Sequence, residues 1–314
     1  MTSRFLIPFF IQIFEAENRI DLDVVTSDRM PTALSNDDNA AAAVGNIPDS
    51  TVLKRQSRAT RRPRPEPPQM DIDFSIPSSF RAKLPRAWLV RVSVRALLIH
   101  VLYVRGAVPT PVLEILRVYE QATTKISREQ RSMIKCGGVL QRLLHQWDEI
   151  MNSDFAQHID AVLVSLGQSW SRPREQYVLQ FNGLGQDSET DQKVVPTDQQ
   201  AHTLMRRLVS TIMNSTNGCE DQNVADWMVK PALGASSYQV QLSFWVSKPT
   251  AEQIFQGNTP VMVRHDFFLN QPTRNKPALI QTRMGVAATD EWNEASGIWM
   301  TLPTTVKGFR LTRR

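Results

Sequence analysis

The stretch AWLVRVSVRALLIHVLYV at positions 87–104 is apolar on almost every side of a 3.6-residue helix. Arg91 and Arg95 give it a single polar strip. A helix that is apolar on most sides is buried, so this stretch predicts a helix at the centre of a globular core. Gly106 ends the helix, and Pro109 enforces a loop after it.

Patterns further along the chain predict the remaining elements. Residues 238–246 alternate between apolar and polar, which is typical of an antiparallel strand with one face on the core. Gly137 and Gly138 fall inside a helix and predict a weakness of about 1 kcal/mol each. We expect helices over about 112–121, 128–152 and 197–214, and strands over about 159–166, 175–181, 238–246, 261–268 and 298–302. Helices followed by antiparallel strands indicate an α+β fold.

Composition divides the 314 residues into a leader and one domain. Residues 26–79 are rich in Ser, Asp, Asn, Ala and Pro, and such a composition cannot pack a core. With 41% apolar and 21% charged residues, the whole chain is still close to the globular average. We therefore expect a mostly disordered leader over 1–77 and a single domain over 78–314.

The positive charge is concentrated in the leader, although the net charge of the chain is only +5. The basic run consists of Lys54, Arg55, Arg58, Arg61, Arg62 and Arg64. The rest of the chain is therefore nearly neutral and lacks the basic face that phosphate contacts require, so we expect no nucleic-acid partner. The run itself is a solvated tail, a nucleic-acid-binding segment, or a two-part nuclear import signal made by Lys54-Arg55 and Arg61-Arg62.

Cysteine usage and hydropathy give expectations about the compartment. Cys136 and Cys219 are too few for a disulfide framework and lack the paired spacing of a zinc site, so a reducing compartment fits best. The apolar start at 5–14 only imitates a signal peptide, because Pro8 and Gln12 interrupt it. No stretch reaches 18 to 20 uninterrupted apolar residues, so we expect no membrane span.

The sequence offers few groups for catalysis. Its five histidines lack the i, i+4 pair with an intervening glutamate that a helical zinc site uses. The pair Gly183 and Gly185 is too short for a dinucleotide fingerprint, and no phosphate-binding loop ending in Lys-Ser/Thr is present. We expect a protein that is not an enzyme, with no cofactor and no metal.

The helix expected over 197–214 carries more apolar surface than one core contact needs. At 100° per residue, Leu204, Leu208 and Ile212 form one stripe, and a second stripe lies beside it. The members of the second stripe and its polar edge are His202, Met205, Arg206, Val209 and Met213. Either the helix is buried on both stripes, or the second stripe faces a partner, for which methionines suit an adaptable surface.

Several stretches, in the same order, resemble the comet family of Mad-two-binding proteins. These stretches are LIHVLYVR at 98–105 with PTP at 109–111, PREQY at 173–177, LMRRL at 204–208, DW at 226–227 and PTTVKGFR at 303–310. The resemblance spans roughly residues 88–310. It implies a HORMA-like fold, in which helices back a central antiparallel sheet and a C-terminal safety belt closes on the chain's own tail.

The resemblance also implies a function. The chain would be a non-enzymatic adaptor of the spindle assembly checkpoint, which binds closed Mad-two and presents it to a hexameric AAA+ remodelling ATPase. It would work in nucleus and cytoplasm, at the spindle or kinetochore during mitosis. The alternative is a HORMA-type structural protein that captures a peptide in meiosis or DNA repair.

The resemblance assigns residues to three surfaces. Val104 joins the second stripe in the Mad-two face, where Val104 and Val209 replace a polar and an aromatic residue of the family, which alters hydrogen bonding and contact area. Lys230 and Pro231 stand in reverse order where the family has its ATPase contact. The belt and tail comprise Trp299, Val306, Lys307, Gly308 and Phe309.

Overall fold

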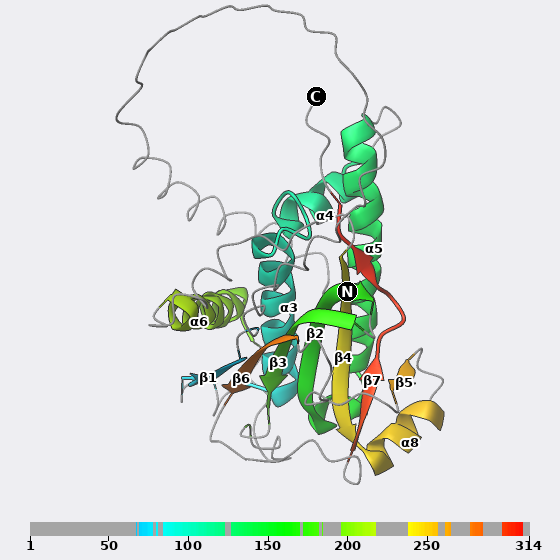
Figure 1. Ribbon diagram of the computed structural model, residues 1–314. Coiled ribbons are helices and arrows are strands. Elements are labelled where there is room, and N and C mark those ends of the chain that lie inside the picture. The colour runs from blue at the N-terminus through cyan, green and yellow to red at the C-terminus, as the bar shows by residue number, and fades with distance from the viewer. Residues whose placement is uncertain are drawn as a thin grey trace, which may run out of the picture. The chain divides into compact units, whose positions relative to one another are not determined.

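The apolar stretch forms helix α3 (Arg86–Val104), as predicted, in a computed structural model of the chain (Figure 1). Its side chains are buried along almost the whole length from Leu89 to Leu102. The structure describes residues 67, 69–77, 80, 84–122, 127–169, 172–181, 184, 196–217, 238–256, 261–264, 277–284 and 297–309, and all of them belong to one compact unit.

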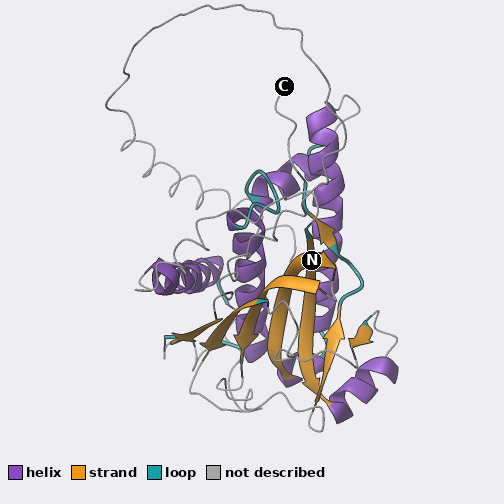
Figure 2. Cartoon of the chain, in the orientation of Figure 1, coloured by secondary structure: helices purple, strands orange, loops and turns teal. Residues whose placement is uncertain are grey.

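The described strands form a single sheet with the order β1-β6-β3-β2-β4-β7-β5, and β8 pairs with β4 (Figure 2). The strands are β1 (Gln69–Phe74), β2 (Ile159–Ser169), β3 (Arg172–Gln180), β4 (Gln239–Ser247), β5 (Met262–Arg264), β6 (Ala278–Met284), β7 (Gly297–Thr301) and β8 (Val306–Lys307). The other helices are α4 (Val112–Glu120), α5 (Arg128–Met151), α6 (Asp198–Asn217), α8 (Lys248–Gln256) and the short 3₁₀ turn η1 (Asp154–His158). The α+β class is therefore confirmed.

The sheet is mixed, which corrects the expectation of a wholly antiparallel one. Strand β6 pairs in parallel with β3 on one side and with β1 on the other. Strand β1 lies in the stretch assigned to the leader, and β6 and α8 were not predicted at all. Ile72 and Phe74 of β1 are buried. Such a short strand is stabilised by pairing with a distant segment, and a local pattern does not reveal that.

Strand β4 is buried on both faces, so the prediction of one solvated face is wrong. Its polar positions are accommodated by partners: the hydroxyl groups of Ser243 and Thr301 lie 2.8 Å apart and are hydrogen-bonded. On the same face Trp245 packs edge-to-face on Trp299, with ring centroids 5.6 Å apart. The sheet therefore has a second, smaller apolar cluster on the side opposite α3.

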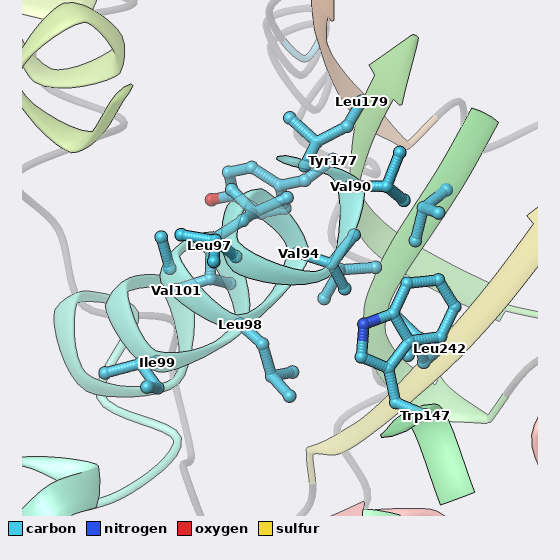
Figure 3. Close-up of a cluster of buried hydrophobic side chains, with 14 of the residues drawn as sticks. Val90, Val94, Leu97, Leu98, Ile99, Val101, Trp147, Tyr177, Leu179 and Leu242 are labelled. Atoms are coloured by element: carbon cyan, nitrogen blue, oxygen red, sulfur yellow. The ribbon is translucent and has the colours of Figure 1, made fainter. Parts of the chain in front are cut away.

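Helices α3 and α5 share the main core with the centre of the sheet. Figure 3 shows Val94 and Leu98 of α3 pointing toward Trp147 of α5, with Leu242 of β4 beside that ring. The polar strip of α3 also turns toward α5: Arg91 and Arg95 both pair with Asp148. Burial lowers the pKa of Arg91 despite the neighbouring carboxylate.

The glycine pair inside α5 has a packing role, because it accommodates α4. A Cβ atom at Gly137 would lie 2.6 Å from Cβ of Tyr119 and 3.1 Å from the carbonyl oxygen of Ile115. At Gly138 the nearest atom would be Cε2 of the Tyr119 ring, at 3.0 Å. The absence of side chains at both positions therefore lets the two helices approach closely.

We predict that Gly137→Ala lowers the free energy of unfolding by about 1–3 kcal/mol, because overpacking exceeds the gain in helix propensity of about 1 kcal/mol. Denaturant unfolding measures the change. Gly138→Ala is the matched control and should cost less, since the Tyr119 ring edge is able to rotate away. Stabilisation by Gly137→Ala would contradict close packing at this contact.

His100 is buried in the same core, and burial lowers the pKa of its imidazole to about 4. The unfolded chain takes up this proton near pH 6.5, so the unfolded state binds more protons between pH 6.5 and 4. The free energy of unfolding therefore keeps the full contribution of neutral His100 above pH 6.5, and loses it as the pH falls toward 4.

We therefore predict that His100→Gln flattens the dependence of unfolding free energy on pH between 6.5 and 4, by up to about 3 kcal/mol across the window. Urea titrations at several pH values measure it. The wild-type chain, titrated in the same series, is the reference. If His100→Gln kept the wild-type slope of unfolding free energy against pH, the lowered pKa of His100 would be refuted.

Helix α3 is also the one described helix that is long and apolar enough to cross a membrane by length and composition. In this fold 67% of its most apolar 18-residue stretch is buried inside the protein. A central core helix meets the same criteria, and the contacts of α3 with α5 and α6 are those of a core helix.

Candidate functional site

Helix α6 begins with the capping box that the sequence predicts. The backbone N–H of Gln200 donates to the Thr197 hydroxyl at 3.3 Å, and the Thr197 N–H donates to Oε1 of Gln200 at 2.8 Å. This reciprocal pair satisfies two N–H groups that the helix itself leaves unbonded, and so fixes where α6 starts. The position of every later side chain on the helix follows from that start.

One side of α6 belongs to the core. Leu204, Leu208 and Ile212 are fully buried, and the helix packs against α3 and β1. Met205 is also buried, with 7% of its surface exposed. The prediction that Met205 faces a partner with the rest of the second stripe was therefore wrong. At 100° per residue Met205 lies next to Ile212, on the border of the core side.

The rest of the second stripe remains accessible, and we call it the α6 surface: His202, Arg206, Val209 and Met213. These four positions fall within about 60° of the helix circumference. Met213 is 41% exposed, Arg206 is exposed, and His202 and Val209 are half-buried. Among the described residues only Met213 and Met262 are large apolar side chains with this degree of exposure. The α6 surface thus combines apolar contact area with positive charge.

Val104, the remaining residue assigned to the Mad-two face, is half-buried at the last position of α3. Helices α3 and α6 pack against each other, so the two elements that carry the assigned residues are neighbours (Figure 1).

The C-terminal segment lies along this chain's own β4. Trp299 of β7 pairs with Trp245, and Val306 and Lys307 of β8 pair with Val240 and Gln239. Trp299, Val306 and Gly308 are buried, Phe309 is half-buried, and Lys307 is exposed.

Two backbone hydrogen bonds hold the end of this tail. The N–H of Gly308 donates to the carbonyl of Tyr238 at 2.9 Å, and the N–H of Phe309 donates to the carbonyl of Ala107 at 3.0 Å. The tail is thereby attached both to β4 and to the loop that follows α3.

A buried ion pair joins that loop to the sheet. The Arg105 guanidinium donates to both carboxylate oxygens of Glu175 on β3, at 2.9 and 2.8 Å, and the Tyr177 hydroxyl donates to Glu175 at 3.2 Å. Arg105 and Glu175 are only 3% and 4% exposed. Burial, followed by the nearby carboxylate, raises the pKa of Tyr177 well above its usual range. Local patterns did not predict this pairing, because they show only two charges at the ends of apolar segments.

We predict that Glu175→Gln lowers the free energy of unfolding by about 3–5 kcal/mol, because it leaves the Arg105 charge buried without its partner. The double variant Arg105→Met, Glu175→Leu should recover most of the loss, since no buried charge is left. Thermal and denaturant unfolding of the three proteins test this. If Glu175→Gln changed the free energy of unfolding only slightly, the pair of Arg105 and Glu175 would have to be solvated.

Other assigned residues lie outside the described part of the chain. They are Lys230 and Pro231 of the ATPase contact, and Lys54, Arg55, Arg61 and Arg62 of the nuclear signal.

The described residues include no group of three or more His, Cys, Asp or Glu that could hold a metal ion. Cys136 is buried, and burial raises the pKa of its thiol to about 11, which keeps it protonated and unreactive. The α6 surface is the candidate functional site among the described residues, because it combines exposed apolar area with positive charge. Comparison with protein-family models and with curated proteins gives no match for this chain.

Proposed function

We propose that this protein is a non-enzymatic adaptor with a HORMA-like fold, which binds closed Mad-two through the α6 surface. It then presents Mad-two to a hexameric AAA+ remodelling ATPase, and so helps to disassemble the mitotic checkpoint complex and to silence the spindle assembly checkpoint. ATP would be bound by the ATPase and not by this chain. We place the adaptor in nucleus and cytoplasm, and at the spindle or kinetochore in mitosis.

The observation that carries the proposal is the division of α6 into two sides. Leu204, Leu208 and Ile212 are buried, while Arg206 and Met213 on the adjacent side are exposed. Exposed methionine beside arginine is typical of protein interfaces, in which both residue types are enriched. The same helix carries the LMRRL stretch that resembles the partner-binding helix of the comet family.

The C-terminal tail favours the adaptor over the peptide-capturing alternative. An extended peptide that adds to a sheet needs an unpaired strand edge. The outer edge of β4 is already paired with β7 and β8 of the same chain. Capture of a peptide at this edge would first require displacement of the tail.

We predict that Val209→Glu combined with Met213→Glu weakens binding of closed Mad-two at least about tenfold, because a buried unpaired charge at an interface centre is strongly unfavourable. Isothermal titration calorimetry measures the affinity, and circular dichroism checks the fold. Met262→Glu, at the exposed methionine of β5, is the matched control and should bind as wild type does. Equal binding by the α6 double variant would exclude this surface.

A further inference from the structure

We propose that Ser210 is a phosphorylation site, and that its modification closes the α6 surface to its partner. The regulatory half of this inference rests on the proposed function, whereas the modification half does not. Ser210 lies in the stretch Arg206-Arg207-Leu208-Val209-Ser210, directly after the half-buried Val209. Protein kinases select substrates partly by charge patterns around the acceptor, and arginines shortly before a serine are one such pattern.

The position of Ser210 on α6 makes its hydroxyl accessible. Opposite the buried Leu204 and Leu208, Ser210 lies near the middle of the exposed side of the helix. Its only hydrogen bond among the described residues is a long one of 3.5 Å, which Oγ accepts from Asn214. The hydroxyl of Thr203, by contrast, donates to the carbonyl of Gln199 at 2.8 Å. Ser210 therefore keeps its hydroxyl proton available.

Arg206 and Arg207 supply charges that a phosphate needs. Both are exposed, and neither forms an ion pair with any described residue. They precede Ser210 by four and three positions, so they lie one turn away on the same part of the helix.

The modification is a phosphoryl transfer from ATP. The Ser210 oxygen forms a bond to the γ-phosphorus, the bond between that phosphorus and the β-phosphate oxygen breaks, and ADP leaves. The hydroxyl proton passes to the catalytic base of the kinase. The helix surface gains a charge of about −1.5 to −2 at pH 7.

This charge changes the α6 surface in two ways. The phosphate attracts Arg206 and Arg207, which are then withdrawn from a partner. It also places a strongly hydrated group beside Val209 and one turn before Met213, where docking requires the removal of water.

The modification is tested by incubating the full folded chain with ATP and a serine kinase that selects arginine three positions before its acceptor. Mass spectrometry should locate a phosphate on Ser210, and Ser210→Ala should lack it. A chain that remains unmodified at Ser210, while a peptide covering 203–214 is phosphorylated, would overturn the assignment of the folded protein as substrate.

The regulatory half is tested by the affinity of closed Mad-two for wild type, phosphorylated protein and Ser210→Asp. We expect the Kd to rise at least about tenfold in the latter two. Ser132→Asp, the same change at an exposed serine of α5, should leave Kd unchanged. Equal affinity of wild type and modified protein would overturn the regulatory half alone. If the wild type did not bind closed Mad-two, the regulatory half and the proposed function would both be overturned. The assignment of Ser210 as a phosphorylation site would remain valid.

Discussion

Burial of α3 between the sheet, α5 and α6 is the constraint on which the rest of the structure depends. Fully burying a valine, leucine or isoleucine side chain contributes roughly 1.5–3 kcal/mol to the free energy of unfolding. Helix α3 buries more than ten residues. A helix with so little polar surface needs neighbours on several sides, so the sheet and the other helices form around it. Arg91 and Arg95 of α3 fit this enclosure because Asp148 of α5 pairs with both.

The exposed side of α6 follows from the same constraint. Helix α6 covers α3 with Leu204, Leu208 and Ile212, and a helix shares only part of its circumference with one neighbour. The apolar residues left over, chiefly Val209 and Met213, then lie at the margin of the core or outside it. A surface of this kind is held in a fixed geometry by the buried side, which is what recognition of a partner requires.

Sequence patterns predicted elements with strong local signals and missed those that depend on distant partners. The helices α3 to α6 were correct to within a few residues, because their periodicity and capping residues are local. Strands β1 and β6 were missed, since their parallel pairing joins segments about two hundred residues apart. The packing role of the α5 glycines was missed for the same reason: helix propensity says nothing of Tyr119 on the neighbouring helix.

For the candidate site, the helical periodicity identified the right helix but not the boundary between its two sides. Met205 was assigned to the accessible stripe, yet it is buried, because the extent of a core depends on what packs around the helix.

Hydrogen–deuterium exchange with and without closed Mad-two directly tests whether the α6 surface binds Mad-two. We expect slower exchange along α6 and at the end of α3 in the presence of Mad-two. Unchanged exchange in α6, with protection confined to other elements, would contradict it.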